Sequence, residues 1–292
     1  MVPKEVLKNI RRIQITTSRM VSDVFAGQYQ SVFKGKGMEF DEVREYLPGD
    51  EIRAIDWNVT ARMGHPYVKK FVEERELTVM LMLDMSSSCF FGTSKQLKIG
   101  LAAEICSLLA FSAIRNNDKV GLIIFTDRIE KFVPPRKGAR HVLRVIREAL
   151  YFKPEGTSTD ITAALQYLNG VTTRKTVTFI ISDFYAQGYK RMLAVANKRH
   201  DIIAITITDP RELDLPDVGI IALDDVETGE RFTVDTSKAS VRRQYAEQGR
   251  MRMKERAGLF GSIGVDSIDL RTDMPYVQSL IQFFRKRERR MR

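Results

Sequence analysis

A short pattern of oxygen-bearing side chains follows an apolar run in the first half of the chain. The run at 78–83 predicts a β-strand, and Asp84, Ser86 and Ser88 come directly after it as Asp-x-Ser-x-Ser. A carboxylate and two hydroxyls at the end of a buried strand cost free energy unless something satisfies them. A hard divalent cation such as Mg²⁺, or Mn²⁺ or Ca²⁺ in its place, binds oxygen ligands of this kind. The pattern therefore predicts a loosely held cation with a position left open for a partner's oxygen.

Two later segments carry matching oxygen atoms. Asp183 follows a second apolar run at 176–181, and the loop at 156–160 brings Thr159 to the start of a predicted helix. Taken singly, such residues also suit helix caps and turns. In an open α/β sheet, however, ligands gather at the carboxyl ends of the strands, where these side chains would meet. We therefore expect Asp84, Asp183 and the hydroxyls to converge on one site.

Enzymatic chemistry has weaker support. A strand-end aspartate also suggests a metal-dependent phosphohydrolase that uses the same oxygen cluster, with a carboxylate that attacks phosphorus. The haloacid-dehalogenase pattern needs a second aspartate two residues after the first, where Ser86 stands. The chain has no P-loop pattern, and His65, His141 and His200 lie far apart, so we expect surface or turn histidines rather than a hydrolytic triad. The prediction is a protein that is not an enzyme.

The elements that must position these side chains alternate regularly from residue 77 onward. Apolar runs at 78–83, 120–125, 176–181 and 202–207 predict strands, and helical patterns fall at 94–116, 139–150, 160–168 and 186–198. Runs that are apolar on both faces are typical of a parallel sheet covered by helices. The alternation predicts a doubly wound, mostly parallel α/β sheet.

The two flanks differ from this central pattern. Helical spacing predicts a helix over 4–20, and residues 27–76 suggest loops and short strands. After residue 210 we expect a hairpin around 227–230, a long helix over 239–257, a strand at 265–270 and a final helix from about 274. The predicted organisation is an N-terminal helix and extension over 1–76, a core over 77–210, and a C-terminal segment over 211–292 that packs on the core.

Composition limits the class of protein. The 292 residues are 43% hydrophobic, with neither a run of about 18 apolar residues that could span a bilayer nor a secretory signal. Two cysteines without a pairing framework suit the cytoplasm. The net charge of +10 includes a basic run at 285–292, which we expect to be the solvated end of a helix. The alternative is a basic scaffold that contacts nucleic acid or anionic lipid, although no nucleic-acid-binding motif accompanies the run.

The oxygen pattern resembles the metal-ion-dependent adhesion site of the von Willebrand factor A domain. By that resemblance, Ser86, Ser88 and Thr159 supply hydroxyl ligands, and Asp84 and Asp183 act directly or through water. Thr159 is preferred to the neighbouring Thr157 because it immediately precedes Asp160 and the helix, although Thr157 stays open as the ligand.

A second string of residues is similar to a bacterial family known as domain of unknown function fifty-eight. Its members resemble von Willebrand A domains and are commonly encoded beside MoxR-type AAA+ ATPases. The resemblance implies an adaptor or partner of such an ATPase or of its client. The matching segments are 35–40, 44–50, 53–57, 61–62 and 73–76 upstream, with 215–219 and 227–230 downstream.

The upstream string contains Trp57, the one tryptophan of the chain. Large aromatic side chains are highly buried on average, so we expect Trp57 to anchor this segment on the sheet. The alternative is an exposed surface that binds the partner.

Overall fold

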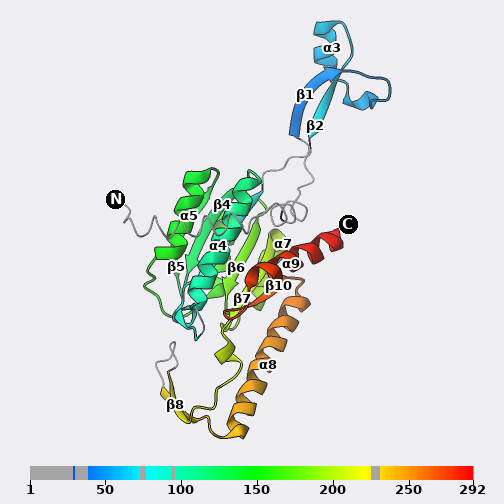
Figure 1. Cartoon of the computed structure of the whole chain (residues 1–292). Coiled ribbons are helices and arrows are strands. Elements are labelled where there is room, and N and C mark those ends of the chain that lie inside the picture. The colour runs from blue at the N-terminus through cyan, green and yellow to red at the C-terminus, as the bar shows by residue number, and fades with distance from the viewer. Residues whose placement is uncertain (1–28, 30–38, 73–76, 94–95, 225–230, 292) are drawn as a thin grey trace. The chain divides into compact units, whose positions relative to one another are not determined.

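Six strands form the central sheet of the computed structural model (Figure 1), which describes residues 29, 39–72, 77–93, 96–224 and 231–291. The strand order is β10-β7-β6-β3-β4-β5, and only the β4–β5 pair is antiparallel. The strands are β3 (Thr78–Asp84), β4 (Lys119–Phe125), β5 (Ile129–Arg136), β6 (Val177–Ser182), β7 (Asp201–Thr208) and β10 (Asp266–Arg271).

Five of these strands agree with the sequence prediction, and β5 was not predicted. The β5 segment contains Pro134 and Pro135, which cannot donate hydrogen bonds to a neighbouring strand. The structure accommodates them because β5 lies at the edge of the sheet. An edge strand that contains prolines is therefore difficult to recognise from the sequence.

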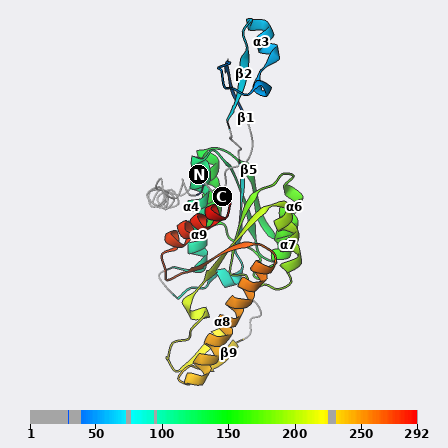
Figure 2. The same ribbon diagram turned by 90° about the vertical axis from the view of Figure 1, so that its right-hand side faces the viewer.

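Helices cover both faces of the sheet, as Figure 2 shows. On one face lie α4 (Lys98–Arg115), α5 (Ala139–Tyr151) and α9 (Tyr276–Met291). On the other lie α6 (Ile161–Val171) and α7 (Lys190–Arg199), which enclose an apolar core with the sheet. All residues of β3 after Thr78 are buried. The predicted doubly wound, mostly parallel α/β sheet is confirmed.

A two-stranded hairpin and a long helix follow β7 in the chain. The antiparallel strands β8 (Ile220–Asp224) and β9 (Arg231–Asp235) flank the predicted hairpin turn, which lies outside the described residues. The helix α8 (Ala239–Ser262) runs from this hairpin back to the sheet (Figure 1) and extends five residues beyond the predicted 239–257. Of α8, only Gly249, Arg256 and Phe260 are buried; Phe260 belongs to the apolar core, and Leu259 packs against it.

Residues 33–77 form a separate compact unit, distinct from the unit of 1–32 and 78–292. In it, β1 (Glu39–Glu45) pairs antiparallel with β2 (Tyr67–Val72), and η1 (Ile52–Ala54) and α3 (Trp57–Met63) lie between them. The predicted helix over 4–20 lies outside the described residues.

Trp57 is not buried within this unit, since its side chain is 67% exposed, and its contact with the sheet stays a prediction. Trp57 begins α3, a helix of seven residues of which none is buried. The Asp56 carboxylate caps this helix through the backbone N–H groups of Asn58 and Val59 and pairs with Lys69. Capping therefore stabilises α3 although none of its apolar residues is fully buried.

Candidate functional site

The carboxylates predicted for the site stand at neighbouring strand ends. Asp84 is the last residue of β3 and Asp183 directly follows β6, and these strands pair in parallel. Both side chains are buried. The Oδ1 atom of Asp84 accepts the backbone N–H of Ser86 at 2.9 Å, and Oδ2 accepts the hydroxyl of Ser182 at 2.5 Å. Both carboxylate oxygens of Asp84 are thus already engaged within the protein.

The two serines of the pattern lie beside each other. Ser86 precedes η2 (Ser87–Phe90), a short 3₁₀ turn that brings the side chain of Ser88 back toward the strand end. Their Oγ atoms are 3.1 Å apart. Adjacent ligands of an octahedral Mg²⁺ at 2.0–2.1 Å lie about 3.0 Å from each other. The spacing of the two hydroxyls therefore fits two neighbouring positions of such a cation.

The threonine loop lies against this turn. The backbone N–H of Ser87 donates to the carbonyl oxygen of Thr157 at 2.7 Å, while the side chain of Thr157 is exposed. The Thr159 Oγ1 atom is buried and has no hydrogen-bond partner in the described structure. A buried hydroxyl without a partner costs about 1–3 kcal/mol. This loop thus brings an unsatisfied oxygen to the same sheet edge as the serines, and it favours Thr159 over Thr157 as the candidate ligand.

Two residues that the sequence analysis missed hold this loop in place. The Glu130 carboxylate accepts the backbone N–H groups of Gly156 at 2.7 Å and Glu155 at 3.2 Å. A Cβ at Gly156 would stand 2.1 Å from Asp127 Oδ1 and 2.2 Å from Thr126 Oγ1. Only glycine allows this approach. A glycine before a threonine-rich loop was the one sequence signal for it.

A buried lysine, also missed from sequence, binds the second aspartate. The Lys98 ammonium donates to Asp183 Oδ2 at 2.8 Å and to Glu212 Oε1 at 2.6 Å. Lys98 is 1% exposed. Glu212 ends η3 (Pro210–Glu212), where it forms a capping box with Asp209. The sequence Asp-Pro-x-Glu could have predicted this cap, but nothing local indicates that Lys98 reaches it.

Burial dominates the electrostatics of the site. It raises the pKa of Asp84 to about 6, and the nearby charge of Asp183 adds to this effect. Burial also raises the pKa of the Cys89 thiol well above its usual value. For Lys98, burial lowers the pKa, but the carboxylates of Asp183 and Glu212 outweigh it and the net shift is upward. Lys98 is therefore a permanent cation, and the Cys89 sulfur remains a thiol.

A cavity of about 10 Å³ lies next to the two aspartates, which is the space of about one water. Its polar lining comes from Asp84, Lys98, Ser182 and Asp183. Within the described segments, no group of three His, Cys, Asp or Glu side chains is arranged to hold a metal ion. A cation would therefore depend on hydroxyl ligands. Ser86, Ser88 and Thr159 fit that role, and Asp84 and Asp183 fit that of fixed negative charges.

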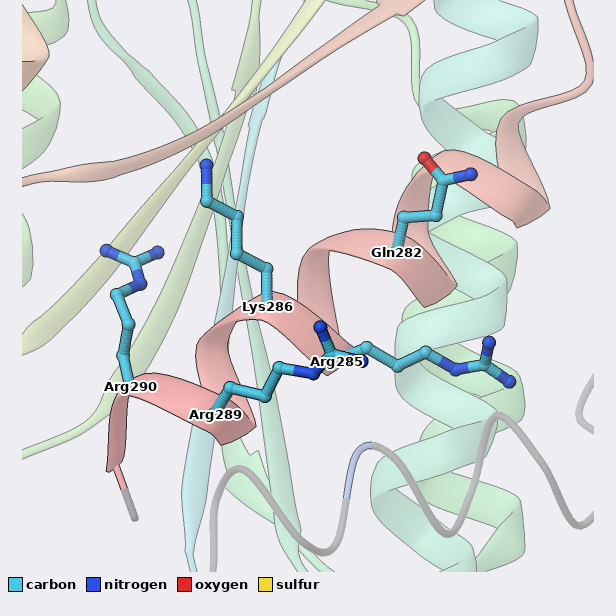
Figure 3. Close-up of a pocket in the computed structure, with 5 residues that line it drawn as sticks. All are labelled: Gln282, Arg285, Lys286, Arg289 and Arg290. Atoms are coloured by element: carbon cyan, nitrogen blue, oxygen red, sulfur yellow. The ribbon is translucent and has the colours of Figure 1, made fainter.

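A basic hollow lies on α9, away from the strand-end residues. It has a volume of about 410 Å³ and is lined by Gln282, Arg285, Lys286, Arg289 and Arg290 (Figure 3). Arg290 also pairs with Asp266 of β10 at 2.9 Å. Arg285, Lys286, Arg289 and Arg290 are thus exposed on the helix, as expected for its solvated end, whereas Arg287 of the same run is buried.

The six-stranded sheet with helices on both faces defines a doubly wound, mostly parallel α/β protein. The model of the family "Protein of unknown function DUF58" matches residues 42–255, and the chain belongs to this family. The uncharacterized protein Rv1480 of Mycobacterium tuberculosis is 31% identical over 285 residues, which cover 96% of this chain and 89% of that protein.

Solved structures show more distant likeness. The conserved hypothetical protein BatB from Bacteroides thetaiotaomicron is 18% identical, with a TM-score of 0.45, over 73% of this chain and 99% of that one. The SpRpn10 VWA domain is 10% identical, with a TM-score of 0.38, over 71% of this chain and 94% of that one. In the part of the chain that the structure describes, no helix is both long and apolar enough to cross a membrane.

Proposed function

We propose that this protein is a divalent-cation-dependent protein-interaction module and not an enzyme. Ser86, Ser88 and Thr159 would hold Mg²⁺ or a similar cation over the ends of β3 and β6. Asp84 and Asp183 would supply negative charge and orient the hydroxyls and waters. A carboxylate of a partner protein would complete the coordination, because a neutral oxygen gains less from the cation.

The observation that carries this proposal is the buried, unpartnered hydroxyl of Thr159, on the loop whose Thr157 carbonyl accepts a hydrogen bond from Ser87. Its oxygen is buried without a hydrogen bond, on a loop that is bonded to η2. Buried polar groups normally have partners, and each exception calls for an explanation such as an ion. A cation ligated by all three hydroxyls would remove that cost.

The phosphohydrolase alternative needs an accessible carboxylate that attacks phosphorus. Asp84 is fully buried. One of its carboxylate oxygens accepts the backbone N–H of Ser86, and the other accepts the hydroxyl of Ser182. A carboxylate held in this way is suited to orient other groups, not to reach a substrate. This arrangement supports the non-enzymatic function.

The partner we propose is a MoxR-type AAA+ ATPase or its client, in the cytoplasm. This part of the proposal rests on the family, whose members are commonly encoded beside such ATPases. Cys89 and Cys106 are free and buried, which suits a reducing compartment.

The test is capture of the MoxR-type ATPase by the purified protein, with Mg²⁺ and with EDTA. We expect capture with Mg²⁺ that EDTA abolishes, and loss of capture in Asp84→Asn, which keeps the size of the side chain. Capture that is equal with and without EDTA contradicts the cation dependence. A Mg²⁺-dependent phosphatase activity that Asp84→Asn removes would establish the enzyme instead.

A further inference from the structure

The ammonium of Lys98 occupies a place where charge strongly affects the binding of a cation. It is buried between Asp183 and Glu212, and it lines the same small cavity as Asp84. Burial of a charge costs several kcal/mol unless partners compensate it. The side chain is therefore held firmly in place by its two carboxylates.

The balance of charge around the cavity follows from these contacts. Lys98 is ion-paired with two carboxylates, those of Asp183 and Glu212, and it lines the cavity together with Asp84 and Asp183, so its charge cancels one of the negative charges near the site. It also engages Oδ2 of Asp183, which leaves less of that carboxylate for any other cation. A buried positive charge repels a second cation much more strongly than it would in water.

The same lysine is part of a contact between the site and the helix α8. Arg256 of α8 donates to the backbone carbonyl of Asp183 at 3.0 Å and pairs with Asp269 at 3.1 Å. Arg252 lies over the ring of Tyr185 at 5.5 Å, and Lys98 lies 5.7 Å from that ring. Asp183 is thus fixed from both sides, by Lys98 at its carboxylate and by α8 at its backbone.

We propose that Lys98 sets the cation affinity of the strand-end site, as an internal positive charge that keeps the bare cation weakly bound. The inference rests on the proposed function. Lys98 is a positioning residue here, since it holds Asp183 and does not ligate the cation. A partner's carboxylate brings one negative charge and so offsets the charge of Lys98 when the partner binds.

The test measures Mn²⁺ binding by isothermal titration and by the electron paramagnetic resonance signal of free Mn²⁺, in a series of full-length variants that differ in charge. Lys98→Met makes the site more negative by one charge, Glu212→Gln makes it less negative, and the double variant keeps the original sum. We expect Lys98→Met to tighten the Mn²⁺ Kd about tenfold or more and Glu212→Gln to weaken it by a similar factor. The double variant should stay within about threefold of the parent protein.

Lys175→Met serves as the matched control, because Lys175 is exposed and precedes the other end of β6. This variant should bind Mn²⁺ as the parent does. Circular dichroism checks each fold, and if Lys98→Met does not fold, Glu212→Gln and the double variant still test the dependence on charge.

The outcomes separate the two proposals. If the parent protein binds Mn²⁺ and loses it in Thr159→Val, while the Kd is unchanged across the charge series, the role of Lys98 is refuted and the cation site stands. If neither the parent nor any folded variant binds Mn²⁺, both proposals fail. Binding that appears only in Lys98→Met supports both.

Discussion

The hydroxyl of Ser182 donates a 2.5 Å hydrogen bond to Asp84 Oδ2 and so joins the ends of β6 and β3. Ser182 also accepts the backbone N–H of Phe184 at 3.0 Å, at the turn that carries Asp183. The first aspartate of the pattern is thereby tied to the segment that holds the second. Asp84 acts as a fixed charge within a rigid sheet edge, and the buried Thr159 hydroxyl, which has no hydrogen-bond partner in the described structure, keeps free capacity to bind another group.

The Thr159 hydroxyl gives the sharpest test of that capacity. Thr159→Val removes an unpartnered buried hydroxyl and keeps the shape of the side chain. We expect the free energy of unfolding without cation to stay the same or rise by up to about 1 kcal/mol. The increase in melting temperature that Mn²⁺ gives the parent protein should disappear, because a ligand is gone. Differential scanning fluorimetry with and without Mn²⁺ measures both effects.

Thr206 offers the matched control, since its Oγ1 is also buried without a partner but lies within β7. Thr206→Val should leave the Mn²⁺ effect intact. If Thr159→Val retains the full increase in melting temperature, Thr159 is not a ligand.

Gly156 tests whether the loop position matters for the site. Gly156→Ala places a Cβ against Thr126 and Asp127, so we expect a loss of about 1–3 kcal/mol in the free energy of unfolding. The displaced loop should also weaken Mn²⁺ binding. Urea unfolding and Mn²⁺ titration measure the two effects.

The control is Gly170→Ala in α6, where an added Cβ meets nothing within 4 Å. That change should stabilise the protein by a few tenths to about 1 kcal/mol because it replaces a helical glycine. Equal behaviour of the two variants would show that the tight approach at Gly156 is not needed.

The sequence predicts those parts of the fold that depend on local pattern. Short runs that are apolar on both faces identify the parallel strands, and strand-end residues such as Asp84 and Asp183 follow from that topology. Lys98 and Glu212 are 114 positions apart in sequence and meet only through the packing of α4 against the sheet. No local pattern reports such a contact.

The solvent exposure of some side chains could not be predicted from the sequence either, because it depends on which elements pack around them. Trp57 is exposed on α3, which buries none of its residues, whereas His200, expected at the surface or in a turn, is 1% exposed. His200 begins the connection from α7 to β7, where polar groups of other elements surround it. Residue type alone does not distinguish these cases.

Two arginines of α9 should differ strongly in how much they contribute to the free energy of unfolding. Arg287 is buried and pairs with Asp201 and, at 3.1 Å, with Asp266. Arg287→Met should lower the free energy of unfolding by about 3 kcal/mol, because Asp201 loses its partner and Asp266 keeps only Arg290. Arg289 is exposed beside the basic hollow, and Arg289→Met should change it by less than about 0.5 kcal/mol. Urea unfolding of the pair decides this, and equal losses would contradict the structure.

The last prediction concerns acid stability and rests on His200. Its Nδ1 accepts the backbone N–H of Thr176 at 3.3 Å, which places the proton of the neutral ring on Nε2, 3.1 Å from Asn169 Oδ1. If Nδ1 were protonated, its N–H would face the backbone N–H of Thr176, and neither donor would have an acceptor there. Burial lowers the pKa of His200 to about 4, and the charges of Arg199 and Lys175 add to this effect.

Because the unfolded chain has a His200 pKa near its usual value of about 6.5, it binds more protons than the folded protein between pH 6.5 and 4. The stability that His200 contributes is therefore present above this window and is lost as the pH falls through it. We expect the free energy of unfolding to be lower by roughly 1 kcal/mol at pH 5 than at pH 7. This is less than the full pKa shift would give at about 1.36 kcal/mol per pKa unit, because solvent screens part of the effect. His200→Gln can still accept from Thr176 and donate to Asn169 but does not titrate, so its loss over the same range should be smaller by that amount. Urea unfolding at pH 7 and pH 5 measures the difference, and parallel losses in both proteins would show that another group titrates.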